Sequence, residues 1–162
     1  MKPLFRALVA INLILLLAYF AWSVREKEIL LSEGELLLFE LAPEDPRSLI
    51  QGDYMALRYA VASDWQNDSL PKNGYIVVSK DENGVAQKER LQAGREPVAS
   101  GEHLVNYTAS GWQLNIGSES YFFQEGQADL YETAKYGGLR IDGKGNSLLV
   151  GLYDEDLKLL SY

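Results

Sequence analysis

The residues of this chain whose types could do chemistry are few and lie far apart in the sequence. Ser48 precedes the pair Gly52–Asp53 by four positions, and the pair directly precedes an aromatic-rich segment. His103 is the single histidine, and there is no cysteine. A serine hydroxyl becomes nucleophilic only when a positioned base takes its proton, and a Ser–His–Asp triad would need His103. The chemistry to consider is therefore hydrolysis that uses Ser48 or Asp53.

Each of these candidates also has a structural explanation, which we favour. Ser48 has no lysine at a recognisable place to act as its base, so it is better explained as a polar residue of a turn. His103 alternates with Val105 and Tyr107 along one strand face, where a lone histidine is more often a surface or hydrogen-bonded residue than a catalyst. The evidence for a transition-metal site is as weak as that for catalysis, because the chain offers one histidine and scattered carboxylates as ligands. We therefore expect no catalysis, no metal and no cofactor.

Two carboxylates remain as candidates for structural or interaction roles. Asp53 is the first residue of a strand face that is expected to be buried. Its carboxylate should therefore accept hydrogen bonds from backbone N–H groups of the turn or pair with Arg47. Glu125 follows an aromatic run at the expected end of a strand. There it could lie near Asp53, and the structural explanation is an ion pair with Arg47, Arg58 or Arg140.

The segment "DPRSLIQGDYMALRY", which runs from Asp45 to Tyr59, must position these groups. Asp45 is placed to cap a helical turn that Pro46 opens and that Gly52 ends. The strand that follows alternates between two faces. We expect one face to carry Asp53, Met55, Leu57, Tyr59 and Val61, and the other to carry Tyr54, Ala56, Arg58 and Ala60.

The composition limits the class of protein. The chain has 162 residues, of which 47% are hydrophobic, enough for one domain and a small extra element. Its 15 basic and 23 acidic side chains give a net charge of −8. Binding to a nucleic-acid backbone or to an anionic membrane surface needs a cationic patch, so the charge argues against both.

The amino-terminal region carries a membrane signal. The run from Ala7 to Val24 has 18 residues, and its polar interruptions are Asn12 and Ser23. About 20 apolar residues cross the hydrocarbon core of a bilayer, and aromatic residues gather at the far end of this run, where their rings favour the headgroup layer. The sequence therefore predicts an uncleaved transmembrane anchor.

The competing interpretation of this run is a cleaved signal peptide. Ala21 and Ser23 are small residues at the two positions that a peptidase inspects, although signal cores usually have about 7–15 apolar residues. The two flanks of the apolar run carry equal numbers of lysine and arginine residues. The positive charge of the terminal amine weakly favours an orientation with the amino terminus in the cytoplasm. We predict a cytoplasmic stub and transmembrane anchor over residues 1–27 and a periplasmic β-rich domain over residues 28–162.

The rest of the chain reads as short strands separated by turns. The apolar runs "ILL" and "ELLLFEL" on either side of Gly34 indicate two strands or one broken strand. Asn83–Gly84 and Ser110–Gly111 each indicate a hairpin, and residues 143–146 indicate a closing one. "SYFFQEG" is a further strand, and "QADLYETAKYGG" is a helix that the pair Gly137–Gly138 stops. This order predicts a mainly antiparallel β (α+β) domain with one short late helix, preceded by a single N-terminal transmembrane helix.

A resemblance to a known family rests on the same segment. Residues 52–59, "GDYMALRY", satisfy the pattern that names the GDYxxLxY family. The preceding "APEDPRSLIQ" resembles the lead-in of that family, and "YFFQEG" and "GKGNSLLVGL" resemble its later blocks. The matching positions are Asp45, Pro46, Arg47, Gly52, Asp53, Tyr54, Leu57, Tyr59, Glu125 and Gly126.

The resemblance implies a membrane-anchored bacterial protein without an assigned activity, of a kind often encoded beside multi-pass membrane proteins. We therefore hypothesise a periplasmic binding or accessory domain, held at the inner membrane, that supports an integral membrane partner. Its contact surface is expected at Tyr54, Arg58 and the loop from Asp45 to Gly52. One alternative is a hydrolase that uses Ser48 or Asp53, because type I signal peptidases also carry a Gly–Asp pair before a strand. The other is a ligand-sensing module with a pocket between the β layers.

Overall fold

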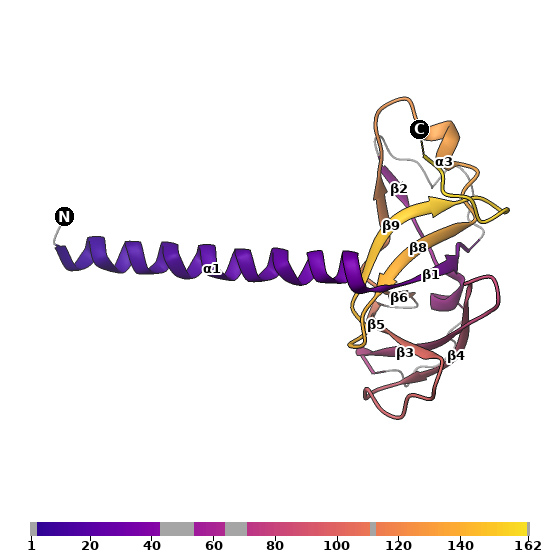
Figure 1. Ribbon diagram of the computed structural model, residues 1–162, viewed down its shortest axis with the longest axis horizontal. Coiled ribbons are helices and arrows are strands. Elements are labelled where there is room, and N and C mark those ends of the chain that lie inside the picture. The colour runs from indigo at the N-terminus through magenta and orange to yellow at the C-terminus, as the bar shows by residue number, and fades with distance from the viewer. Residues whose placement is uncertain (1–2, 43–53, 64–70, 111–112, 162) are drawn as a thin grey trace.

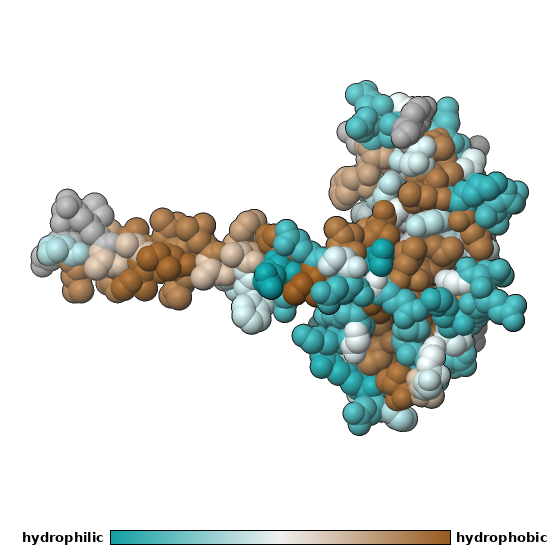
Figure 2. Space-filling view, in the orientation of Figure 1, coloured by the Kyte–Doolittle hydropathy of each residue, from teal (hydrophilic) through white to brown (hydrophobic). Residues whose placement is uncertain are grey.

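The computed structural model describes residues 3–42, 54–63, 71–110 and 113–161 of the chain. Its longest element is the helix α1, Pro3–Glu33, which projects away from the β-rich remainder (Figure 1). Among the described residues, α1 is the one helix long and apolar enough to cross a membrane or to serve as a signal sequence. Figure 2 shows its apolar side chains giving way to hydrophilic ones where the helix nears the domain.

The helix continues well past the predicted anchor. The prediction that Ile29–Leu31 form a strand is wrong, because these residues belong to the last turns of α1. Periodicity alone cannot separate a helix from a strand in so short an apolar run. The packing of Leu30 decides for the helix, since this side chain enters the domain and is only 4% exposed.

The first antiparallel sheet brings together the two ends of the domain in the order β1-β8-β9. Its strands are β1 (Glu35–Glu40), β8 (Tyr136–Ile141) and β9 (Ser147–Tyr153). The β8–β9 pair confirms the predicted closing hairpin. In its turn, Asp142 Oδ1 accepts hydrogen bonds from the backbone N–H groups of Lys144 at 2.8 Å and Asn146 at 2.9 Å. These contacts fix the turn of the hairpin.

The second antiparallel sheet has the order β4-β3-β5-β6. Its strands are β3 (Asn73–Lys80), β4 (Ala86–Gln92), β5 (Glu102–Ser110) and β6 (Gln113–Asn115). The β3–β4 pair confirms the hairpin predicted from Asn83–Gly84, and Gly84 has the positive φ of 84° that such a turn needs. The β5–β6 pair confirms the second hairpin, whose turn residues 111–112 lie outside the described residues.

A smaller antiparallel pair carries the described part of the "GDYMALRY" segment. β2 (Tyr54–Ala56) pairs with β7 (Ser120–Phe122), and a 3-10 turn, η1 (Ala60–Ala62), follows β2. After β7 comes α3 (Ala128–Tyr131), so the predicted late helix is present but has only one turn.

The stop signal predicted at Gly137–Gly138 is wrong, because both glycines lie inside β8. Close packing explains their presence there. A Cβ atom on Gly137 would lie 2.9 Å from the ring of Tyr59, and one on Gly138 would lie 2.5 Å from the ring of Tyr153. Each glycine leaves room for an aromatic ring that packs closely against the strand.

The core lies between the sheets and is closed by the β2 segment. Its fully buried side chains come from the two larger sheets and from the segment after β2, and are Tyr59, Phe39, Leu37, Ile76, Leu139, Leu152, Val77, Val78 and Val105. The fold class predicted from the sequence is therefore confirmed: a long apolar helix is followed by antiparallel sheets with a short late helix.

The junction between α1 and the first sheet is one residue long. Gly34 N–H donates to the carbonyl of Leu30 at 3.0 Å, and Arg140 Nη1 donates to the carbonyl of Gly34 at 2.6 Å. A Cβ atom on Gly34 would lie 2.4 Å from the Leu30 carbonyl oxygen. Because Glu35 already belongs to β1, the helix is fused to the sheet without a linker.

Candidate functional site

The described part of the "GDYMALRY" segment has a buried face and an outer face, as the alternation predicts. Met55 and Leu57 are each 2% exposed, and Tyr59 is 1% exposed. On the other face Tyr54 is half-buried and Arg58 is exposed. The inner residues therefore belong to the core, and the outer ones reach the surface of the domain.

Tyr59 locks the segment to three other parts of the domain. Its hydroxyl donates to the carbonyl of Ser118 at 2.8 Å. Its ring meets Phe39 edge to face, with centroids 6.1 Å apart, and lies against Gly137. Burial, with the nearby charge of Glu119, raises the pKa of the Tyr59 hydroxyl far above its ordinary value, so the group stays protonated. The role of this tyrosine is to hold the fold together.

Tyr54 forms the outer surface of the segment together with Phe122. The two residues are opposite each other in the β2–β7 pair, and their ring centroids lie 5.7 Å apart. Phe122 is 74% exposed. An exposed aromatic ring beside a tyrosine is typical of protein contact surfaces, because both supply large contact area at a small entropic cost. We call these residues the Tyr54–Phe122 pair.

A second aromatic group supports β7 from the inside. Tyr121 and Phe123 both pack on Tyr131 of α3, with ring centroids 5.1 and 5.3 Å apart. Burial, followed by a hydrogen bond to Tyr131, raises the pKa of Tyr121 to about 12. The strand that presents Phe122 is thus held in place by neighbours on both of its sides in sequence.

Arg58 ties the segment to the second sheet. With the Gln113 amide in its hydrogen-bonded orientation, the amide oxygen accepts from both terminal nitrogens of Arg58, at 3.0 and 3.2 Å. The backbone carbonyl of Arg58 also accepts a hydrogen bond from Ala42 N–H at 2.8 Å. Arg58 is therefore an exposed but positioned cation between β2 and β6.

The structure describes only some of the other predicted site residues. Asp45, Arg47, Gly52 and Asp53 lie outside the described residues, as does Ser48 of the hydrolase hypothesis.

Glu125 is exposed in the turn between β7 and α3. Within the described ranges it forms no ion pair with Arg58 or Arg140, its two described candidate partners. Arg140 donates instead to the carbonyl of Gly34.

His103 lies next to the base of α1 and not next to the "GDYMALRY" segment. Its Nδ1 is 3.7 Å from the carboxylate of Glu35, the first residue of β1, and Lys80 Nζ is 2.6 Å from the same carboxylate. The hydrogen bond from Lys80 is the main reason that the pKa of Glu35 is lowered. In the part of the chain that the structure describes, no group of three histidine, aspartate or glutamate side chains could hold a metal ion.

A cleft that sequence analysis did not predict lies between α1 and the domain. It has a volume of about 1330 Å³, and its walls are the last turns of the helix, the loop before β5 and the β8–β9 turn. Residues from these three parts include Trp22, Arg25, Arg95, Val98 and Lys144. The cleft lies beside the helix, whereas the ligand-sensing alternative expects a pocket between the β layers.

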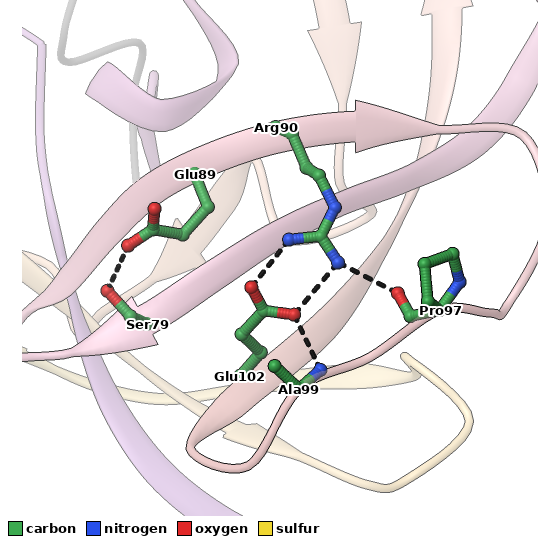
Figure 3. A network of polar contacts seen from close by, with 6 residues as sticks. All are labelled: Ser79, Glu89, Arg90, Pro97, Ala99 and Glu102. Atoms are coloured by element: carbon green, nitrogen blue, oxygen red, sulfur yellow. Dashed lines mark hydrogen bonds and ion pairs between the residues drawn. The ribbon is translucent and has the colours of Figure 1, made fainter.

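One wall of this cleft is stiffened by an ion pair (Figure 3). Arg90 donates two hydrogen bonds to the Glu102 carboxylate, at 2.5 and 2.8 Å, and a third to the carbonyl of Pro97. Glu102 also accepts from Ala99 N–H at 2.8 Å. These donors, Arg90 first, lower the pKa of Glu102 to about 2. The loop before β5 is therefore closed on itself by charge-assisted hydrogen bonds.

Two contributors to the site were missed by sequence reasoning. Phe122 reads as an ordinary strand residue, and its exposure follows only from its register with Tyr54. The cleft joins residues near 25, 97 and 143, which no local pattern connects. The apolar character of Leu30 next to a charged segment is the one signal that could have indicated a packed helix end.

A family model matches most of the chain. The model described as GDYXXLXY protein covers residues 16–152, from the middle of α1 almost to the end of β9. The search of curated proteins found no match, and the search of solved structures found none either.

Proposed function

The chain belongs to the GDYXXLXY family, and on that premise we propose that it is a membrane-anchored accessory domain that binds an integral membrane partner and performs no catalysis. In this proposal α1 remains uncleaved in the bacterial inner membrane, with the amino terminus in the cytoplasm and the β-rich domain in the periplasm. The partner is a multi-pass membrane protein.

The observation that carries the proposal is the direct junction of the helix with the sheet. A signal peptide is removed after export, so the mature domain has no need of its packing. Here the side chain of Leu30 belongs to the domain, and the hydrogen bond from Arg140 to Gly34 ties the helix end to β8. Cleavage after Ser23 would leave Val24–Glu33 as a helical stub whose purpose is hard to explain. An anchor explains both the long helix and its packed end.

The junction also limits where the domain can be. The stem of α1 between Arg25 and Glu33 has nine residues, about 13 Å of helix at about 1.5 Å per residue. The domain is therefore held close to the headgroup layer and shares a thin zone with the outer loops of other membrane proteins. Such confinement raises its effective concentration toward them even when its intrinsic affinity is modest.

The surface that we assign to the partner is the Tyr54–Phe122 pair together with Arg58, which lies on the same outer face of the segment. The aromatic rings supply apolar area, and the guanidinium supplies hydrogen-bond donors. The inner half of the segment positions this surface and does not contact the partner, because Leu57 and Tyr59 are buried.

The test uses full-length protein purified in mild detergent from its own membranes. We expect an intact amino terminus by mass spectrometry, resistance to carbonate extraction, and co-purification of a multi-pass protein. The variant Tyr54→Ala/Phe122→Ala should lose that protein while remaining in the membrane. The matched control Glu82→Ala/Glu155→Ala changes two exposed residues elsewhere and should retain it.

Two results would contradict the proposal. One is a mature chain that begins after the apolar run, which would mean a cleaved signal peptide. The other is an anchored chain whose co-purifying proteins are the same in the aromatic double variant and in the control.

A further inference from the structure

The transmembrane-length part of α1 has a polar stripe. Asn12, Tyr19 and Ser23 are seven and four positions apart. At about 100° per residue they fall within an arc of about 40°. The 18-residue apolar window of the helix has no residue buried inside the described structure, so nothing in the described chain covers this stripe.

Asn12 is the residue of the stripe whose transfer into the bilayer costs the most free energy. It lies 13 residues before Arg25, about 20 Å along the helix axis. The hydrocarbon core of a bilayer is about 30 Å thick, so an anchored helix places this carboxamide inside it. A carboxamide has two donors and an acceptor, and in hydrocarbon they stay unpaired unless another side chain reaches them. Asparagine side chains in membranes accordingly form hydrogen bonds between helices.

The stripe lies on the same side of the helix as the residue that packs into the domain. Leu30 follows Asn12 by 18 residues, about five full turns, and therefore lies on the same side. Leu30 packs into the domain and also lines the cleft beside the helix. Whatever covers the stripe in the membrane thus ends directly below the domain and its cleft.

The position of the domain at the end of α1 limits which kind of protein can cover the stripe. Figure 1 shows the domain extending to both sides of the helix axis, so two copies joined through the stripe would bring their two domains side by side over the helices. Helices in contact are only about 8–10 Å apart, a separation that leaves little room for two such domains. A helix that ends in a short loop fits this space, and the cleft of about 1330 Å³ offers room for the loop.

We propose that the face of α1 formed by Asn12, Tyr19 and Ser23 binds a transmembrane helix of another, multi-pass protein that presents an amide or hydroxyl side chain at the depth of Asn12. This inference rests on the proposed function, because it requires α1 to stay in the bilayer. It adds that the anchor itself recognises the partner and that part of the specificity lies inside the membrane.

The test is photo-cross-linking of the full-length chain in its own membranes. A photoreactive residue replaces Leu16, which lies on the stripe side, or Ile14, which lies at nearly the same depth on the opposite side. We expect Leu16 to cross-link to a peptide from a transmembrane helix of a multi-pass protein and Ile14 to give no such product. Asn12→Leu should reduce the Leu16 product by roughly threefold or more, and Asn12→Gln should retain it.

Several outcomes overturn the inference. They are a product with the mass of two copies of this chain, products with lipid alone, equal yields from both positions, and a yield that does not depend on Asn12. If these occur in an intact, carbonate-resistant chain, the anchor stands and only the helix-face inference fails. If the chain has lost its first residues, the proposed function fails as well.

Discussion

At the scale of single residues, the two tyrosines of the "GDYMALRY" segment have separate roles. Tyr59 is 1% exposed and hydrogen-bonded to Ser118, whereas Tyr54 faces outward against the exposed ring of Phe122. Alternation along an extended chain is enough to separate them, because neighbouring side chains point to opposite sides. One sequence pattern thus combines a core anchor with an outward-facing aromatic residue.

Removing the Tyr59 hydroxyl should destabilise the protein without changing its surface. Tyr59→Phe leaves the buried carbonyl of Ser118 without its donor, so we expect the free energy of unfolding to fall by about 1–3 kcal/mol. Urea unfolding of the full chain in detergent measures this. Phe122→Ala is the control and should change the free energy by less, since the side chain is 74% exposed. Equal losses in both variants would contradict these roles.

Glu102 should make stability depend on pH in the acid range. Its pKa falls from 4.5 to about 2 on folding, so its contribution is fully present above about pH 4.5 and is lost as the pH falls toward 2. Glu102→Gln should lower the melting temperature at pH 7 and flatten its decline between pH 4.5 and pH 2. Melting curves at three pH values test this, with Glu82→Gln as an exposed control. An unchanged decline in Glu102→Gln would assign the acid sensitivity to other groups.

At the scale of elements, local signals predicted the hairpins but not the elements that depend on distant packing. Asn83–Gly84 supplies a positive φ within the turn itself, so the β3–β4 hairpin was predictable. Gly137–Gly138 reads locally as a helix stop, yet the rings of Tyr59 and Tyr153 require these glycines within β8. Leu30 reads as a strand residue, and its helical state is set by the core that it enters.

For the candidate site, the same division holds. The burial of Leu57 and Tyr59 and the outward direction of Tyr54 followed from alternation. The pairing of Tyr54 with Phe122 did not, because β2 and β7 are separated by more than 60 residues and no local pattern sets their register. The position of His103 at the base of α1 likewise depends on a contact with β1.

The junction residue should tolerate no side chain. Gly34→Val places a Cβ atom 2.4 Å from the Leu30 carbonyl oxygen, so we expect a loss of about 1–3 kcal/mol from overpacking and a displaced helix end. Gly143→Ala is the matched control, because a Cβ atom there meets no atom within 4 Å. Urea unfolding of both variants makes the comparison. A tolerated Gly34→Val would mean that the helix end is not packed on the domain.

At the scale of the whole molecule, the helix runs directly into the domain. The contacts of Leu30, Gly34 and Arg140 tie the end of the helix to the first sheet. We therefore expect the domain to keep one orientation relative to the helix axis. A partner that holds α1 also holds the outer surface in a defined direction.

A flexible insertion should separate anchoring from orientation. Eight Gly/Ser residues between Glu33 and Gly34 should leave the domain folded and attached, because a chain of this composition behaves as a coil. The chain has no cysteine, so spin labels can be placed at Ser23→Cys and Gln87→Cys alone. We expect a narrow distance distribution in the parent chain and a broad one after insertion. A parent distribution as broad as that of the insertion variant would rule out a rigid junction.

The pairing of β1 with β8 also sets an order of events during synthesis. Glu35 lies opposite Ile141, which the ribosome adds 106 residues later. At roughly 5–20 residues per second, this delay is on the order of 5–20 s. If α1 is the anchor that we propose, it enters the bilayer while the strand fused to it has not yet been given its partner strand. During that interval each nascent chain exposes an unpaired, leucine-rich strand edge close to the membrane surface.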